Sequence, residues 1–248
     1  MSLSDDGSGH GPGGAWRVVH RRGSAAELHA LDLPGPAPVG RELWVLEATA
    51  PAVVLGSAQR RLAGGGEATP VRSSGGGAVL VDPDRCLWVD VVIGRDDPLW
   101  HDDVGRSGLW LGRCWQVALA TFDVAGDVHD GPADRDELAR AACFAGVGPG
   151  EVVAAGRKLV GISQRRTRSG ARFQCIAYTG RPDSAPVVTA LGTQAPPGLD
   201  AVLAARVGHV TVGPSVLADA LVRAMMSASP VVDGPAPDAA PSSSTVGS

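Results

Sequence analysis

Two stretches of sequence decide the expected fold, RSSGGGAVLVD at residues 72–82 and GRKLVGISQRR at residues 156–166. In the first, three successive glycines leave backbone N–H groups uncovered, so a ligand could approach the main chain closely. Arg72, with its planar fork of donors, could hold a carboxylate or a phosphate beside that backbone. Glycine content alone favours a plainer interpretation, a flexible start to a hairpin, because the run lacks the Lys-Ser/Thr of a P-loop and the spacing of a dinucleotide fingerprint.

The second stretch contains Lys158, the only lysine among 22 basic residues. An ammonium is a compact charge that can meet a single oxygen and can shift its pKa when it is buried, which arginine does not do. Period-2 alternation places Lys158 on the same strand face as Val160 and Ile162, so we expect it to point toward an apolar surface. The alternative is a lysine at a strand end whose amine reaches solvent.

Apolar, β-rich runs predict strands at residues 43–48, 52–56, 86–93, 151–154, 158–164 and 172–178. Apolar residues at helical spacing predict an amphipathic helix over 103–122, with Asp102 or Asp103 capping its start, and a final helix over 216–227. Segment 123–137 is rich in Gly, Pro and Asp and predicts a surface loop. This pattern indicates one α/β or α+β domain.

The cysteines form no C-x-x-C pair, so we expect neither a metal site nor a disulfide framework. Cys143 precedes a glycine-rich loop, and its neighbours Ala142 and Phe144 favour a small core residue over a nucleophile. The other three, Cys86, Cys114 and Cys175, fall in strand or helix patterns and are interpreted as packing residues. His101 stands before two aspartates that suit a helix start, and we assign it no chemistry.

Composition excludes some classes of function. The formal charge of −4 is too weak, and of the wrong sign, for a general nucleic-acid binder. The N-terminus carries acid and glycine where a signal peptide needs basic and apolar stretches, and no run approaches the ~18 apolar residues of a membrane span. We therefore expect a soluble cytoplasmic protein with no nucleic-acid or membrane partner. Residues 1–14 and 229–248 are predicted to be disordered tails around a domain at 15–228.

Together with PAVVLG at residues 51–56 and the pair Cys143-Phe144, the two stretches resemble the catalytic domain shared by lipoate-protein ligases, octanoyltransferases and biotin ligases. The lipoate/octanoate branch, lipoate-protein ligase A-like, is the most similar. The resemblance covers roughly Trp16 to Met226. It implies a single α/β (α+β) domain with a mixed, largely antiparallel sheet flanked by helices, and a tunnel for a medium-length acyl chain.

The resemblance also implies an activity. Lipoate or octanoate would react with ATP and Mg²⁺ to give an acyl adenylate, whose acyl group passes to a lysine of a lipoyl domain in a 2-oxoacid dehydrogenase complex or of the glycine cleavage H protein. Lys158 would contact the acyl carbonyl and the adenylate phosphate, where a fixed cation is most useful in the transition state. The remaining implied binding residues are Arg72, Ser73, Ser74, Gly75, Gly76, Gly77, Ala78 and Gly161.

Other readings stay open. One branch of such transferases has its nucleophile at the place of Cys143, which would then carry a thioester and take its acyl group from acyl-carrier protein without ATP. A third reading is a non-catalytic binder of lipoate-like acids, and a fourth is a biotin ligase. Two departures from the family pattern bear on the choice. Residues 173–176 read FQCI where a His-Gly pair is usual, and no C-terminal accessory domain follows the last helix, so a separate accessory protein is a further expected partner.

Overall fold

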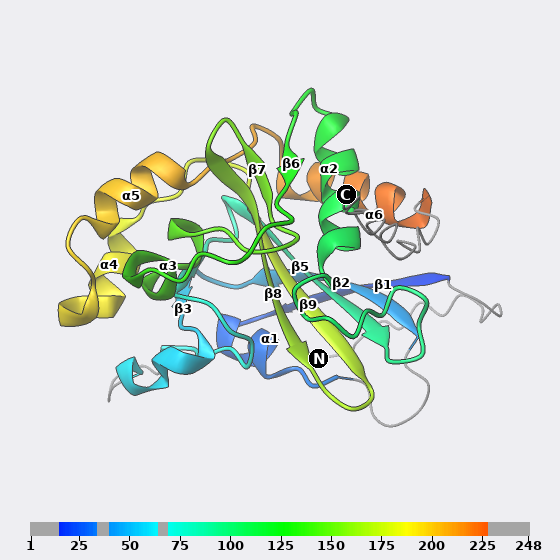
Figure 1. Cartoon of the computed structure of the whole chain (residues 1–248), viewed down its shortest axis with the longest axis horizontal. Helices are drawn as coiled ribbons and strands as arrows, with labels where there is room; N and C mark the ends of the chain where they lie inside the picture. Colours follow the sequence, from blue (N-terminus) through cyan, green and yellow to red (C-terminus); the bar gives the residue numbers. More distant parts are fainter. Residues whose placement is uncertain (1–14, 34–39, 64–68, 228–248) are drawn as a thin grey trace, which may run out of the picture.

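The computed structural model describes residues 15–33, 40–63 and 69–227 (Figure 1). The two expected tails lie outside these described residues. A seven-stranded sheet has the spatial order β1-β2-β5-β9-β8-β7-β6, and β3 pairs with β4 in a small second sheet. In the described part of the chain, the β1–β2 pair of the large sheet is parallel and its other neighbouring pairs are antiparallel. The expected mixed, largely antiparallel sheet with flanking helices is confirmed.

The strands are β1 (Trp16–Gly23), β2 (Arg41–Ala48), β3 (Ala52–Val54), β4 (Val79–Val81), β5 (Cys86–Gly94), β6 (Asp127–Val128), β7 (Val152–Ala154), β8 (Arg157–Arg166) and β9 (Gly170–Tyr178). The α-helices are α1 (Ala25–Ala30), α2 (Leu109–Ala120), α3 (Glu137–Ala141), α4 (Ala185–Leu191), α5 (Leu199–Arg206) and α6 (Pro214–Ser227). Short 3₁₀ turns are η1 (Ser57–Leu62), η2 (Cys143–Ala145) and η3 (Gly192–Gln194).

Strands β5 and β9 form the centre of the sheet and are buried along their whole length. Alternation divides their side chains between two cores, because successive residues of a strand point to opposite faces. Val89 and Val91 join the core beneath α2 and α6, whereas Trp88 and Ile176 join the core beneath β3, β4, η2, α4 and α5. Figure 1 shows these two groups of elements on opposite sides of the sheet. The candidate site lies in the second core.

The long predicted helix starts later than expected. It begins at Leu109, and its N-cap is Gly108, which provides no side-chain cap. Asp103 instead holds the preceding turn, where its carboxylate accepts from the Gly105 N–H at 2.8 Å. The capping prediction is therefore wrong, because glycines at 105 and 108 favour turns ahead of the helix. Segment 123–137, predicted as loop, also contains the short strand β6.

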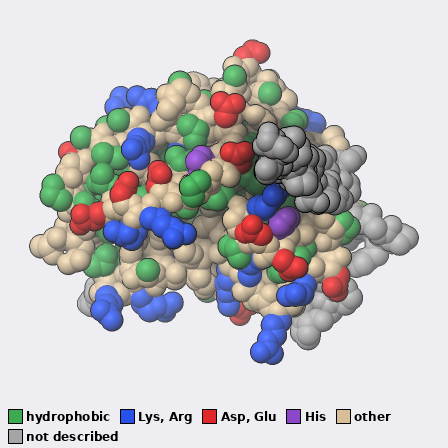
Figure 2. All heavy atoms as spheres, viewed as in Figure 1, with side chains coloured by type: hydrophobic (Ala, Val, Ile, Leu, Met, Phe, Trp, Pro, Cys, Tyr) green, Lys and Arg blue, Asp and Glu red, His purple; other side chains and the backbone are tan. Residues whose placement is uncertain are grey.

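No helix in the described ranges has the length and apolar character needed to cross a bilayer. On the face drawn in Figure 2, acidic and basic side chains are interspersed. This surface agrees with a weakly acidic chain that offers no broad basic patch on that face.

Candidate functional site

Arg72 shapes the glycine run from inside. Its side chain is buried, and its Nε and Nη2 donate to the Gly75 carbonyl at 3.1 and 2.8 Å. Nη2 also donates to the Gly77 carbonyl at 2.8 Å. Burial lowers the pKa of Arg72. The guanidinium thus closes the loop around itself, in addition to any anion it binds.

Gly77 allows two backbones to meet. A Cβ there would lie 2.5 Å from the Ala142 nitrogen and 2.6 Å from the Ala141 carbonyl carbon, far inside contact distance. The next residue, Ala78, donates to the Ala141 carbonyl at 2.9 Å and accepts from the Cys143 N–H at 2.9 Å. The glycine run therefore fixes the position of Cys143, a role that the sequence interpretation, with its N–H groups open to a ligand, did not include.

We expect Gly77→Ala to lower the free energy of unfolding by about 1–3 kcal/mol and to displace Cys143, because the clash is with backbone that cannot rotate away. Gly75→Ala is the matched control: a Cβ at Gly75 has nothing within 4 Å, so its effect should stay within about 0.5 kcal/mol. Urea unfolding of both variants checks the difference. Equal stability of the two variants would contradict the assigned role of Gly77.

Cys143 lines a narrow cavity of about 20 Å³, called the slot here. Its walls are His29, Arg72, Val79, Val81, Trp88, Cys143, Gly161, Ser163, Gln174 and Ile176. Cys143 is half-buried, whereas the other cysteines are buried. Burial raises the pKa of Cys86 to about 12 and that of Cys114 to about 11, and it raises the pKa of Cys175 as well. Of the four thiols, only Cys143 lines the slot.

Lys158 lies beside Cys143 but does not line the slot. Its Nζ is 3.7 Å from the Cys143 Sγ and donates to the Cys143 carbonyl at 2.6 Å. It also donates to the Gly146 carbonyl at 3.1 Å and pairs with the Glu151 Oε2 at 2.7 Å. These partners can occupy all three N–H donors of an ammonium. Lys158 is 3% exposed and lies over the Phe144 ring, as its predicted apolar setting required.

The charge of Lys158 is held in place by its neighbours. Burial by itself lowers the pKa of Lys158, but interaction with Cys143 and Glu151 outweighs burial and raises the pKa above its ordinary value. The amine therefore stays an ammonium at neutral pH. A fixed positive charge 3.7 Å from the sulfur favours negative charge there.

The strand face predicted for Lys158 is wrong. Val160 and Ile162 belong to the core beneath α2 and α6, whereas Lys158 faces Cys143 on the other side. The register explains the switch: Val152 pairs with Val160 but Val153 pairs with Lys158, so two residues of β8 oppose one step of β7. Such a bulge re-aims a side chain and breaks the period of two.

Glu151 is a site residue that sequence reasoning missed. It is buried, its Oε2 accepts from the Gly148 N–H at 2.7 Å, and its Oε1 accepts from the Ile162 N–H at 3.0 Å. Every contact to the carboxylate, including Lys158, therefore comes from a donor. The available signal was an acid at the start of the predicted strand that forms a hairpin with the lysine strand.

A polar network runs from the glycine run to α1. The Ser74 hydroxyl donates to the Gln174 Oε1 at 2.6 Å and shares a hydrogen bond of 3.0 Å with Ser163. The Gln174 amide nitrogen lies 3.0 Å from the His29 Nδ1 and 3.4 Å from the Asp90 Oδ2. Sequence reasoning missed the contribution of His29, which carries no recognisable motif and is far away in the chain.

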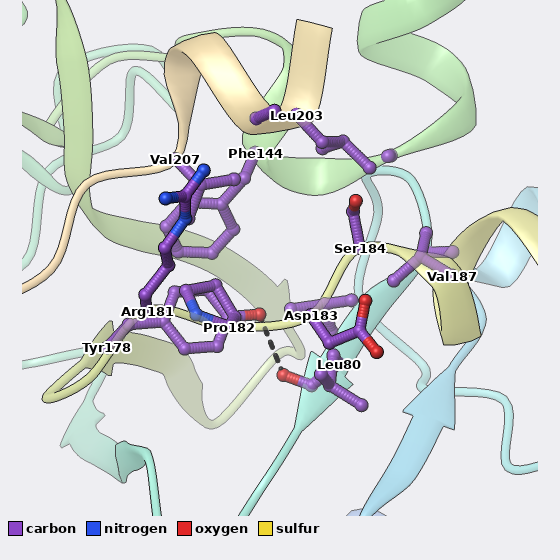
Figure 3. A pocket seen from close by; sticks show the side chains of 14 residues that line it. Leu80, Phe144, Tyr178, Arg181, Pro182, Asp183, Ser184, Val187, Leu203 and Val207 are labelled. Atoms are coloured by element: carbon purple, nitrogen blue, oxygen red, sulfur yellow. Dashed lines mark hydrogen bonds between the residues drawn. The ribbon is translucent and has the colours of Figure 1, made fainter. Parts of the chain in front are cut away.

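A larger cavity of about 190 Å³ lies on the other side of η2. The rings of Phe144 and Tyr178 form one wall, with centroids 4.9 Å apart, and Arg181 and Asp183 lie at the same cavity (Figure 3). The Tyr178 hydroxyl donates to the Leu80 carbonyl at 2.8 Å. Alternation along β4 puts Leu80 on this cavity, and Val79 lines both this cavity and the slot.

Residues 55–180, half of the chain, match the model of the biotin/lipoate A/B protein ligase family. The chain belongs to this family. The matched region of this ligase-family chain includes the glycine run, Cys143, Glu151 and Lys158, so the site just described lies within it. No curated protein sequence gives a significant match.

Solved structures show that this ligase-family chain has the fold of lipoate-protein ligases. Ta0514 of T. acidophilum, solved with bound lipoic acid, has a TM-score of 0.56 at 15% identity over 86% of this chain and 84% of its own. A lipoate-protein ligase A bound with ATP gives 0.55 at 15% identity over 86% and 83%. A bi-partite lipoate protein ligase studied with its E2 lipoyl domain, from Thermoplasma acidophilum, gives 0.54 at 16% identity over 86% and 82%.

The structure of this family member brings together most of the expected site residues. Arg72, Gly161 and Cys143 line the slot, and Ala78 lines the larger cavity. Ser74 joins the polar network. In contrast, Ser73 is exposed and lines neither cavity, and Gly75 and Gly76 are exposed at the loop tip. In the departing segment 173–176, Gln174 and Ile176 face the slot, while Phe173 and Cys175 belong to the opposite core.

His29 makes the stability of this chain pH-dependent. Burial, followed by the charges of Arg72 and Arg172, lowers the pKa of His29 from 6.5 to about 3. Below pH 6.5 the unfolded chain therefore binds a proton that the folded chain refuses, so this contribution to stability is complete above pH 6.5 and is lost as the pH falls toward 3. The loss is at most about 1.4 kcal/mol per pH unit.

We expect urea unfolding curves measured between pH 7.5 and pH 5 to show a steeper loss of stability for the wild type than for His29→Phe, which has no such proton to bind. The difference between the two proteins cancels the carboxylates that both share. Parallel pH profiles of the wild type and the variant would contradict the buried neutral state of His29.

Proposed function

We propose that this chain transfers an octanoyl or lipoyl group to a lysine of a lipoyl domain through a thioester on Cys143. One observation carries the proposal: Cys143 lines the slot, whereas Lys158 lies 3.7 Å from its sulfur, outside the slot, with its donors engaged by protein groups. A saturated ammonium is poorly placed to meet a substrate carbonyl but well placed to stabilise a thiolate.

In the first step, the Cys143 sulfur attacks the carbonyl carbon of an acyl thioester, such as acyl-carrier protein. A new C–S bond forms, the donor thiolate leaves, and it takes up the proton that Cys143 gives up. In the second step, the lysine amine of the lipoyl domain attacks the Cys143 thioester, the amide forms, and the sulfur leaves and recovers a proton from the amine. The Lys158 ammonium stabilises the sulfur anion in both steps.

The slot supplies the acyl site. Its apolar walls, among them Val79, Val81 and Ile176, would gain about 0.8 kcal/mol for each CH₂ they cover. At about 20 Å³ the slot must widen to hold a chain of medium length. Ile176 stands in the segment where the family usually has His-Gly, and its side chain narrows the slot.

A second candidate is the acyl-adenylate route, in which ATP and Mg²⁺ activate free lipoate or octanoate. The larger cavity favours it, because the aromatic wall of Phe144 and Tyr178 and the cation of Arg181 offer a place for a nucleoside and its phosphate beside η2. The bi-partite ligase of Thermoplasma acidophilum, studied with its E2 lipoyl domain, supports lipoyl domains as acceptors and a separate accessory protein as a further partner.

Mass spectrometry of a purified lipoyl domain distinguishes the routes. The protein is incubated with the domain and either octanoyl-acyl-carrier protein, or free octanoate or lipoate with ATP and Mg²⁺. We expect modification from the carrier protein in the absence of ATP. Modification that requires ATP would support the adenylate route instead. Tight binding of the acids by calorimetry without modification from any donor would overturn both routes and indicate a non-catalytic acid-binding protein.

A further inference from the structure

His29 places one unsatisfied hydrogen-bond donor against the slot. The side chain is 9% exposed and lines the slot, and its Nε2 has no hydrogen-bond partner among the described residues. The imidazole is held by its ring contact with Trp88, with centroids 4.4 Å apart, and by Gln174 at Nδ1. Its orientation is therefore fixed, while one of its two nitrogens is left over.

The polar network determines which nitrogen carries the proton. The Ser74 hydroxyl donates to the Gln174 Oε1, so the amide NH₂ of Gln174 is the end that faces His29 and Asp90. An amide NH₂ can only donate, so the His29 Nδ1 must accept. A neutral imidazole then carries its hydrogen on Nε2. The slot therefore presents a neutral N–H donor in a place closed to solvent.

The position of this donor along the slot follows from strand register. Gly161 pairs with Ile176 at one level, and Ser163 pairs with Gln174 two residues further along both strands. Phe144 and Lys158 close over Gly161, with atoms 3.1 and 3.2 Å from where its Cβ would be, so the Cys143 turn lies at the first level.

His29 lies at the second level, through its hydrogen bond to Gln174. At about 3.3 Å per strand residue the two levels are about 7 Å apart, which an extended chain covers in about five or six bonds.

We propose that the slot selects an acid whose chain carries a hydrogen-bond acceptor about five bonds from the carboxyl carbon, which accepts from the His29 Nε2. An oxygen or a polarised heteroatom at that depth satisfies the donor, whereas a plain hydrocarbon chain covers it without a partner. Leaving a buried donor unpaired costs about tenfold to a hundredfold in affinity. The proposal deepens the proposed function by naming the class of acid, and it rests on that function only for the transfer step.

Calorimetry with 6-oxo-octanoate and octanoate tests the selection without any variant. We expect the wild type to bind the keto acid at least about tenfold more tightly, and His29→Phe, which keeps a ring over Trp88 but lacks the N–H, to lose that preference. His20→Phe, at an exposed position on β1, is the matched control and should behave as the wild type does. Equal or tighter binding of octanoate by the wild type, or an unchanged preference in His29→Phe, would overturn the proposal.

Transfer assays separate this inference from the proposed function. The same two acyl groups are offered to the protein as acyl-carrier-protein thioesters, with a lipoyl domain as acceptor. Faster transfer of the keto acyl group supports both proposals. A keto-acid preference in calorimetry with no transfer of either group would sink the thioester route and leave the selection by His29 standing. Binding of neither acid would remove the selection.

Discussion

Replacing Cys143 with serine is expected to reduce acyl transfer to a lipoyl domain by roughly a thousandfold or more, because the nucleophile of both proposed steps is removed. Serine keeps the size and the backbone hydrogen bond to Ala78 but lacks an accessible anion at neutral pH. The rate is measured by mass spectrometry of the acceptor domain with octanoyl-acyl-carrier protein as donor.

Cys114→Ala provides the matched control for this experiment. Cys114 is 4% exposed in the core beneath α2 and α6, away from the slot, so its loss should change the transfer rate little. Thermal unfolding of both variants verifies that each is folded. A Cys143→Ser protein that keeps most of the wild-type rate would rule out an obligatory thioester and favour the adenylate route.

Glu151→Gln is expected to lower the free energy of unfolding by about 3–5 kcal/mol, because it leaves the Lys158 ammonium buried without a counter-ion. Glutamine cannot restore the contacts, since both carboxylate oxygens accept from N–H groups and one would become an NH₂ facing a donor. Urea unfolding at pH 7.5 gives the difference.

Two comparisons sharpen the Glu151 prediction. Glu47→Gln breaks an ion pair with Arg22 in which both side chains are more than half exposed, and it should change stability by less than about 0.5 kcal/mol. The double variant Glu151→Gln, Lys158→Met removes both buried charges and should lose less than the sum of the single changes. Additive losses in that cycle would show that the two residues do not depend on each other.

Local sequence was sufficient for the centre of the fold but not for its edges. Strands β5 and β9 come from long apolar runs whose burial on both faces needs no knowledge of partners. Strand β1, with the sequence WRVVHRRG, was missed because its pairing with β2 compensates for several charged residues. Helices α4 and α5 were missed as well, since short helices depend more on packing than on their own propensity.

The candidate site divides in the same way. Arg72, Cys143, Gly161 and Lys158 were found because they stand within the two family-like stretches or at a family-like spacing. The direction of Lys158 was wrong, because a bulge is set by pairing between strands and leaves no mark in the period of a single strand.

His29 was missed for a different reason. Its role depends on contacts with residues far away in the chain, including Trp88 and Gln174, and no spacing within one segment reports them.

The central claim is that Cys143 carries the acyl group, and the intact mass of this chain tests it most directly. The protein is mixed with octanoyl-acyl-carrier protein, quenched in acid and analysed before and after treatment with hydroxylamine. The account predicts one octanoyl adduct on Cys143 that hydroxylamine removes and that Cys143→Ser does not form. Octanoylation of a lipoyl domain without any such adduct on the chain would contradict it.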